Sequence, residues 1–501
     1  MSGAPHTSLS SADTAWLHMD RPTNLMVINS ILLFGRRVDW ERFEEVIRTR
    51  LLEPYPRFGE RAVESRLVTG GVRWEPDPEF DLARHLHRRG LPAPGDEHAL
   101  QALAGDLASM PLDREKPLWD MYLIDGPSKG SAVIVRMHHC IADGIALAQV
   151  MLSLTDPRAA GTDGAAGADG ATGAADRTNR AMLVGPAALG SHQADPDSHR
   201  ADPGSHGTIG AVRGLAGMVV RESARTLTHP RRALELASGA VADAQALGKL
   251  LLTPADADSV LAHGRGATRC VAWSRPMSLD RIKAIAHAQG ATVNDVLLAA
   301  VSGALRGYLT AHGEEPHELR ALVPVNLRPI GPGAAAELGN RFGLVYLTLP
   351  VDRAGARERL YELKQRMDAI KHSPEGPVSY VLLETAGLAP AGIERYIIDF
   401  FTAKASAVIT NVPGPRETVY MAGSPLRTVL VWAPTAGSVG MSVSVFSYDG
   451  RVTVGLLTHT AQVGDPQAIV GRLHREVATL ARLAPPATPT DGRSGRAAAR
   501  R

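Results

Sequence analysis

The chain has 501 residues, of which 44% are hydrophobic and 21% charged, and its formal net charge is +2. This composition supports sizeable folded cores and excludes a wholly disordered chain, and the near-neutral charge gives no field that would attract nucleic acid. The two cysteines, Cys140 and Cys270, exclude a disulfide framework and fit a reducing compartment.

The N-terminal part of the chain alternates strand and helix patterns. The predicted strands span residues 27–34, 118–124 and 131–137, and the predicted helices span residues 39–47 and 145–154. Asp39 is placed to cap its helix, and the turn formers between the second and third strands predict a hairpin. The segment from His138 to Gly144 therefore lies on a strand-to-helix turn.

The middle of the chain changes composition abruptly. Residues 159–175 consist of Ala, Gly, Asp and Thr, and a Ser-His repeat follows at residues 191–207. Such tracts bury too little apolar surface to offset their conformational entropy, so we predict a disordered insert over residues 156–209. Weak metal binding by the His-rich repeat is the alternative. Apolar periodicity then predicts a helical crossover over residues 210–265.

The C-terminal part again mixes the two patterns. Its predicted helices span residues 278–289, 292–309, 354–371 and 467–483, and its predicted strands span residues 320–325, 343–349, 406–411, 439–445 and 452–457. The fold class is therefore a mixed α/β (α+β) arrangement of two halves, residues 1–155 and 266–485. The Arg/Ala/Gly-rich residues 486–501 predict a disordered tail.

The segment from His138 to Gly144, His-His-Cys-Ile-Ala-Asp-Gly, is the sharpest candidate for a site. Adjacent residues at a strand end point to opposite sides, so only one of His138 and His139 can face a given pocket. A neutral imidazole can take a proton from an alcohol that attacks an acyl carbonyl. Asp143 is placed to orient a ring through its Nδ1 proton or to accept from an Arg, and Gly144 would let the backbone turn tightly.

Other interpretations of this motif stay open on the residues alone. Paired histidines can be satisfied core residues, and two histidines with Asp143 could chelate a metal, although neighbouring strand histidines diverge and the sequence shows no further ligand cluster. Cys140 could act as a nucleophile, but adjacent side chains seldom bring their functional atoms together.

The motif resembles that of the bacterial wax ester synthase/diacylglycerol acyltransferase family, within the wider chloramphenicol-acetyltransferase-like group. Further segments resemble family elements in the same order, and together they cover residues 8–483 apart from the low-complexity tracts. They are Ser11-Ala12-Asp13 with Pro22-Thr23-Asn24, Pro117-Leu118-Trp119, Asn294 to Ala299, Pro324 to Arg328, Gly339-Asn340 and Asn411 to Pro415. Cys140 departs from the pattern, since a non-sulfur residue is expected there.

The resemblance implies two chloramphenicol-acetyltransferase-like subdomains with an active-site tunnel between them. It implies direct transfer of a long-chain acyl group from acyl-CoA, with His139 as general base, His138 supporting and Asp143 mainly structural. Asn294 is the candidate to stabilise the tetrahedral oxyanion, and a plain N-cap is its alternative role. Asn411 is expected to line the site or shape its loop, and Trp119 to belong to the core.

The expected partners are long-chain acyl-CoA as co-substrate and diacylglycerol or a long-chain alcohol as acceptor, with neither a bound cofactor nor a metal. The sequence shows no signal peptide and no apolar run of about 18 residues, so we expect a cytoplasmic protein, with peripheral contact on the inner plasma membrane or lipid droplets through residues 210–252. The rivals are a condensation-type enzyme that uses a carrier-protein thioester, and a non-catalytic lipid-binding protein of the same fold.

Overall fold

The computed structural model describes the two halves of the chain but not residues 158–244 in the middle. The described residues are 7–65, 71–126, 130–157, 245–262, 266–327, 338–371, 373–388 and 391–483. The Ala/Gly tract, the His repeat, the helical pattern before residue 245 and the C-terminal tail lie outside them. The predictions for those segments therefore stay predictions.

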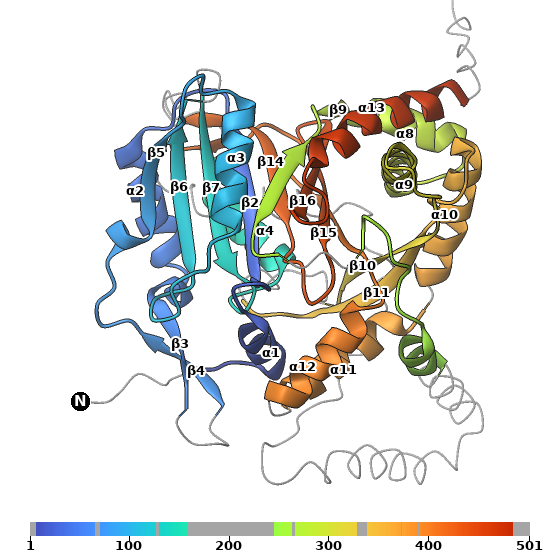
Figure 1. Ribbon diagram of the computed structural model, residues 1–501. Coiled ribbons are helices and arrows are strands. Elements are labelled where there is room, and N and C mark those ends of the chain that lie inside the picture. Colours follow the sequence, from blue (N-terminus) through green and yellow to red (C-terminus); the bar gives the residue numbers. More distant parts are fainter. Residues whose placement is uncertain are drawn as a thin grey trace, which may run out of the picture.

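The first half is built on a six-stranded mixed sheet, the left-hand layer of Figure 1. Its strands, in spatial order, are β13 (Tyr420–Met421), β14 (Ser424–Trp432), β2 (Val27–Phe34), β7 (Ser131–His138), β6 (Trp119–Asp125) and β5 (Leu86–Gly90). Its helices are α1 (Ser11–Met19), α2 (Trp40–Ile47), α3 (Glu97–Ala108) and α4 (Gly144–Ser153), with short helical turns at Arg48–Leu52, Pro56–Gly59 and Leu82–Arg84. A small sheet of β1 (Thr7–Ser8), β4 (Val72–Pro76) and β3 (Glu60–Glu64) flanks it.

The second half is built on a seven-stranded mixed sheet. Its main path is β11 (Phe342–Leu349), β10 (Leu319–Asn326), β12 (Ala407–Pro413), β15 (Met441–Tyr448), β16 (Arg451–His459) and β8 (Arg269–Trp273), and β9 (Met277–Ser278) also pairs with β16. Its helices are α8 (Leu279–Ala288), α9 (Val293–Ala311), α10 (Ala356–Lys371), α11 (Glu375–Gly387), α12 (Ala391–Thr402) and α13 (Pro466–Leu483). Residues 245–252 form a further helix.

The predicted helices and strands that lie in the described residues are confirmed with bounds that differ by at most three residues. β6 and β7 pair antiparallel as the predicted hairpin, and the Asp39 carboxylate accepts a hydrogen bond from the Arg42 amide at 3.0 Å. Trp119 is completely buried and its indole donates to the Phe58 carbonyl, so its predicted place in the core is confirmed. The mixed α/β class is confirmed as well.

Pairing of strands and packing of a helix on a strand both join the halves. β14 leaves the C-terminal part of the chain and pairs antiparallel with β2, so the two sheets do not divide at the boundary near residue 266. On the other side α3 packs directly on β8, where a Cβ at Gly105 would lie 2.8 Å from the Arg269 carbonyl oxygen. The interface between the sheets is therefore built by both halves.

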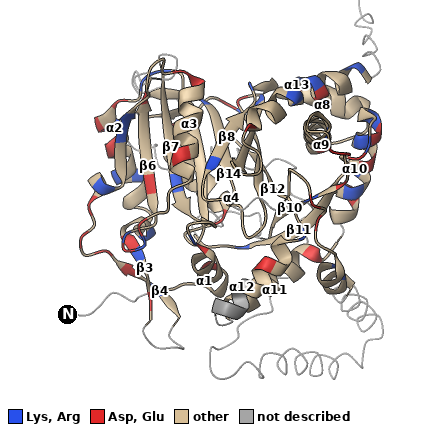
Figure 2. Cartoon of the chain, viewed as in Figure 1, with Lys and Arg blue, Asp and Glu red and all other residues tan. Residues whose placement is uncertain are grey.

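The surface of the described residues carries both charge signs. In Figure 2, blue and red residues alternate along the outer helices α2, α10 and α13, and ion pairs such as Lys364 with Asp368 connect them along one helix. None of the described helices is both long enough and apolar enough to cross a membrane.

The contact between α11 and β11 is close enough to test with glycine substitutions. A Cβ at Gly343 would lie 2.0 Å from the Gly376 carbonyl oxygen. We expect Gly343→Ala to lower the free energy of unfolding by about 1–3 kcal/mol, because backbone must move apart to admit the methyl group.

The matched control is Gly471→Ala in α13, where an added Cβ would meet no atom within 4 Å. Alanine is the better helix former, so this change should raise the free energy of unfolding by about 0.5–1 kcal/mol. Chemical denaturation measures both. Similar effects at the two positions would contradict the close contact.

Candidate active site

The His-His motif leaves β7 on a turn that is fixed by backbone hydrogen bonds. The His138 amide donates to the Leu118 carbonyl at 2.9 Å, and the His139 amide donates to the Met26 carbonyl at 2.8 Å. α4 then begins at Gly144. Gly144 has no positive φ and an added Cβ would meet nothing within 4 Å, so neither the backbone conformation nor the surroundings require glycine at this turn.

The two histidines face opposite sides, as strand geometry predicts. The His139 ring lines a cavity and stacks on Trp16, with ring centroids 4.3 Å apart. The His138 ring is buried on the other side, where its Nδ1 accepts a hydrogen bond from the Cys140 amide at 3.1 Å. Its Nε2 lies 3.7 Å from a carboxylate oxygen of Asp20.

Burial keeps both rings neutral near pH 7. It lowers the pKa of His139 from 6.5 to about 4, and the nearby Asp143 charge and hydrogen bonding by Asn340 offset only part of this effect. Burial likewise lowers the pKa of His138 to about 3. An imidazole in this state has a free lone pair, which is the form that a general base needs.

The Asp143 carboxylate accepts two backbone hydrogen bonds, and it acts on the His139 ring through its charge. One carboxylate oxygen accepts from the Ala146 amide at 2.9 Å, in the manner of an N-cap for α4, and the other accepts from the Arg341 amide at 3.1 Å. The buried Nδ1 of His139 has no hydrogen-bond partner among the described residues. The sequence predicts that Asp143 either orients the His139 ring through Nδ1 or accepts from an Arg. The structure does not show the first of these two roles.

Asp13 and Asn340, whose roles the sequence did not indicate, hold the His139 backbone. The Asn340 side-chain amide donates to the His139 carbonyl and to a carboxylate oxygen of Asp13, both at 2.7 Å. The Asn340 backbone amide donates to the same Asp13 oxygen at 3.1 Å. Burial raises the pKa of Asp13, so this tie costs desolvation that its hydrogen bonds must offset.

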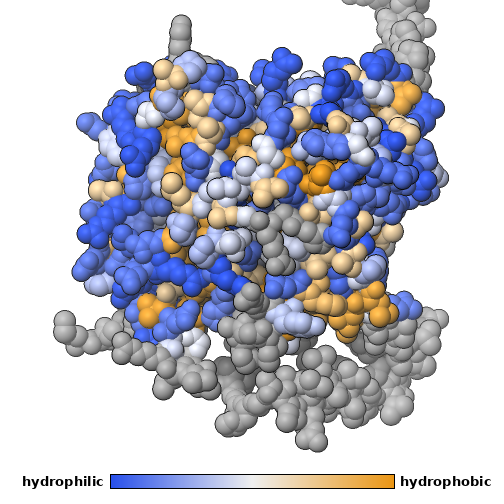
Figure 3. All heavy atoms as spheres, in the orientation of Figure 1, coloured by the Kyte–Doolittle hydropathy of each residue, from blue (hydrophilic) through white to orange (hydrophobic). Residues whose placement is uncertain are grey.

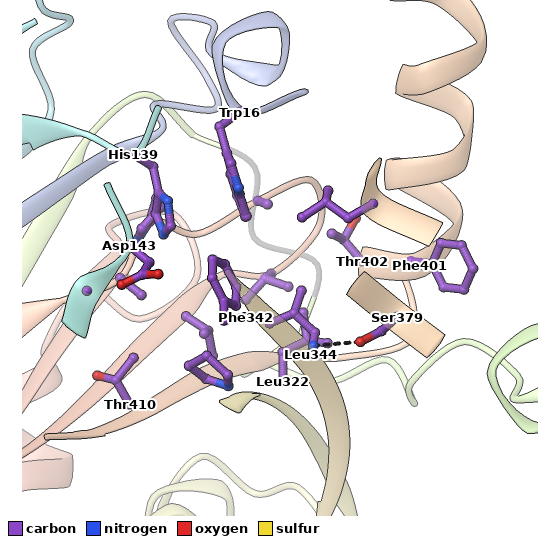
Figure 4. A pocket seen from close by; sticks show the side chains of 18 of the residues that line it. Trp16, His139, Asp143, Leu322, Phe342, Leu344, Ser379, Phe401, Thr402 and Thr410 are labelled. Carbon is purple, nitrogen blue, oxygen red and sulfur yellow. Dashed lines mark hydrogen bonds between the residues drawn. The ribbon is translucent and has the colours of Figure 1, made fainter. Parts of the chain in front are cut away.

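The cavity beside His139 is apolar and has a volume of about 210 Å³. Figure 4 shows the imidazole and the Asp143 carboxylate at one end, Trp16 and Phe342 beside them, and Phe401 and Thr402 farther along. Both halves line it, through α1, β2 and β14 on one side and β10, β11, β12, α11 and α12 on the other. A second, smaller apolar cavity shares Ile28, Gly144 and Val431 with the first.

Asn294 and Asn411 lie next to each other, but only Asn411 belongs to the described wall of the cavity. The Asn411 side-chain amide donates to the Asn294 side-chain oxygen at 2.9 Å. The N-cap interpretation of Asn294 is wrong, because Thr292 caps α9 in a reciprocal capping box with Asp295. Asn294 is thus one residue removed from the cavity surface.

The structure gives no support to the covalent and metal alternatives. Cys140 is completely buried and burial raises the pKa of its thiol, which disfavours the nucleophilic thiolate. Among the described residues, no three His, Cys, Asp or Glu side chains are grouped so that they could hold a metal ion.

Comparisons with known proteins point to one family. A model of the wax ester synthase/diacylglycerol acyltransferase catalytic domain matches residues 9–297, and a model of the WS/DGAT C-terminal domain matches residues 338–481. A probable diacylglycerol O-acyltransferase of Mycobacterium tuberculosis is 27% identical over 469 residues, which cover 92% of each chain.

Solved structures show the same fold. The wax ester synthase/diacylglycerol acyltransferase of Marinobacter aquaeolei VT8 is similar with a TM-score of 0.64 and 22% identity, covering 95% of this chain and 99% of that one. The first condensation domain of the calcium-dependent antibiotic synthetase is similar with a TM-score of 0.55 and 16% identity, covering 96% of this chain and 97% of that domain. The fold is thus shared with a wax ester synthase/diacylglycerol acyltransferase and with a condensation domain.

The tie between Asn340, Asp13 and His139 can be tested by stability. Asn340→Ala removes both side-chain hydrogen bonds and leaves a buried carboxylate and a buried carbonyl underpaired, so we expect a loss of about 2–5 kcal/mol in the free energy of unfolding. Asp13→Asn keeps an acceptor oxygen and removes the buried charge, so its loss should stay below about 1 kcal/mol. Denaturation curves that give equal losses would contradict this assignment.

Proposed function

The chain belongs to the wax ester synthase/diacylglycerol acyltransferase family, and from this premise we propose that it transfers a long-chain acyl group from acyl-CoA directly to the hydroxyl of diacylglycerol. The observation that carries the proposal is the neutral His139 ring at one end of an apolar cavity that both halves of the molecule line. The naming of the mycobacterial relative as a probable diacylglycerol O-acyltransferase supports this acceptor.

In the proposed reaction, His139 takes the hydroxyl proton as the acceptor oxygen attacks the thioester carbonyl. The tetrahedral intermediate then collapses, the carbon–sulfur bond breaks, and the CoA sulfur leaves with the proton that His139 held. The products are an ester and free CoA, and no acyl-enzyme forms. The base contributes about 10²–10⁴-fold, and orientation of the two substrates contributes more.

The neighbouring residues take supporting roles in this proposal. His138 fixes the turn through its bond with the Cys140 amide, and Asp143 fixes the start of α4. Asn294, first considered for the oxyanion, acts through Asn411, whose amide it positions at the cavity wall. We assign no bound cofactor, and acyl-CoA enters as co-substrate.

Three other functions would use the same architecture. A long-chain alcohol in place of diacylglycerol would give wax esters, and the Marinobacter protein carries both activities in its name. A carrier-protein thioester in place of acyl-CoA would give condensation chemistry. The similarity of the fold to a condensation domain is the observation that favours this alternative. A lipid-binding protein would fill the cavity without turnover. We further propose a cytoplasmic location with contact to a lipid surface.

Replacement of the base tests the mechanism directly. Purified protein is given labelled palmitoyl-CoA with diacylglycerol, hexadecanol or water in parallel, and the lipid products are separated. We expect labelled triacylglycerol to dominate, and His139→Ala to lower kcat by at least about 10²-fold while acyl-CoA binding persists. Full activity in this variant would remove His139 from its role, and labelled free fatty acid as the main product would indicate a thioesterase.

The pH profile tests the electrostatics of the site. Because burial lowers the pKa of His139 to about 4, the base stays deprotonated across the neutral range, and kcat/KM should fall only as the pH approaches about 4. The unfolded chain binds protons on these histidines near pH 6.5, so the folded state loses stability as the pH falls below that value. Activity is therefore measured in short assays with the folded fraction followed in parallel, and a drop in kcat/KM centred near pH 6.5 would contradict the assignment.

A further inference from the structure

Exposed apolar side chains gather on one edge of the molecule. The described residues expose eight large hydrophobic side chains, and six of these lie on α11 or at its C-cap Leu388, on α12, and at the end of the 245–252 helix. We call this set the apolar edge, and its members are Leu251, Leu252, Val381, Leu388, Tyr396 and Phe400. Leu252, Tyr396 and Leu388 are 85%, 74% and 70% exposed. Figure 3 shows hydrophobic side chains gathering at the lower right, where Figure 1 places α11 and residues 245–252.

Lys404 joins two parts of the apolar edge. Its ammonium group donates to the carbonyls of Leu250 and Leu251 at 2.5 and 3.0 Å, which satisfies the last turn of the 245–252 helix. The same group lies 3.8 Å from the centre of the Phe400 ring. The end of that helix and the end of α12 therefore lie side by side, and α12 packs in turn against α11.

The helices of the apolar edge also form the far wall of the His139 cavity. Ile398 and Phe401 of α12 line the cavity, whereas Tyr396 and Phe400 of the same helix are exposed. On α11 the pattern repeats, with Leu382, Leu383 and Ala386 lining the cavity and Val381 exposed. A helix with apolar side chains on both sides is normally covered on both sides. Here one side faces the cavity and the other has no cover among the described residues.

We propose that the apolar edge docks on a phospholipid bilayer and that diacylglycerol passes from the bilayer into the His139 cavity, of which α11 and α12 form the far wall. This inference rests on the proposed function, since it concerns delivery of the acceptor to the same site. An acceptor with two long acyl chains resides in the apolar phase and not in water. An exposed apolar surface that shares its helices with an apolar cavity gives such a molecule a path without passage through water. A protein partner would explain the exposed side chains but not why the helices that carry them also form a wall of the cavity.

Flotation with vesicles tests the docking. The probe is vesicles of phosphatidylcholine with a minor fraction of diacylglycerol, and the variant carries Val381→Ser, Leu388→Ser and Tyr396→Ser together. The matched control carries Met110→Ser and Tyr361→Ser, two residues that are 50% and 63% exposed on other parts of the surface. We expect wild type and control to float with the vesicles, and the triple variant to lose at least about tenfold in vesicle affinity.

Activity on two acceptors separates docking from catalysis. With 1-octanol dissolved as monomers, the triple variant should keep its rate within about twofold, whereas its rate on diacylglycerol in vesicles should fall about tenfold. If the wild-type protein transferred the acyl group to neither acceptor, the proposed function would be contradicted. The docking proposal alone would be overturned if wild type and the triple variant transferred to vesicle diacylglycerol at equal rates. It would also be overturned if the protein bound triolein droplets but not vesicles.

A single substitution gives a readout that does not depend on the folding of the triple variant. Leu388→Trp places a fluorophore on the apolar edge, and Tyr361→Trp places one on α10 as its control. Brominated phosphatidylcholine should quench the added fluorescence of Leu388→Trp and leave that of Tyr361→Trp unchanged. Equal quenching, or none, at both positions would overturn the proposal.

Discussion

The site depends on one segment of the second half, residues 338–341, lying against the His-His turn of the first. The Gly339 amide donates to the Ile141 carbonyl, and the Asp143 amide donates to the Gly339 carbonyl. Asn340 then holds the His139 carbonyl, and the Arg341 amide binds the Asp143 carboxylate. His139, the proposed base, is therefore fixed between the two sheets. A shift of one half against the other would move its ring relative to the cavity.

Burial gives this fixed imidazole its chemical state. The apolar walls that lower the pKa of His139 are the same walls that would hold aliphatic chains. A base with so low a pKa is a weak proton acceptor, so its contribution depends on close orientation of the hydroxyl and on exclusion of competing water. The Asp143 charge supports the protonated form of the ring without forming a hydrogen bond to its buried Nδ1. Rigidity and electrostatics thus compensate for modest basicity.

Local parts of this arrangement could be predicted from the sequence, because their causes lie within a few residues. The β6–β7 hairpin, the Asp39 cap and the divergence of the two histidines follow from turn chemistry and strand geometry. The tie between Asp13 and Asn340 joins residues 327 positions apart, and its buried polar atoms carry no periodic signal. β14 could not be assigned to the first sheet, since its pairing partner β2 lies about four hundred positions earlier. The side-chain type of Asn294 and its position at a helix start make it a candidate for the oxyanion, but neither feature shows that Asn411 stands between Asn294 and the cavity.

Water is the competing acceptor for any base that takes a proton from a hydroxyl, so the identity of the product depends on what the cavity admits. The walls offer few polar partners to a water molecule, and Ser379, one of the polar side chains there, already accepts from the Leu344 amide at 2.7 Å. In the proposed reaction, a lipid acceptor differs from water because its acyl chains bury apolar surface along α11 and α12 as its hydroxyl oxygen reaches His139. The burial of these chains contributes binding free energy to the lipid acceptor, and water, which has no apolar chains, gains none of it. In the proposed reaction, the preference for ester synthesis over hydrolysis therefore depends more on the cavity walls than on the imidazole.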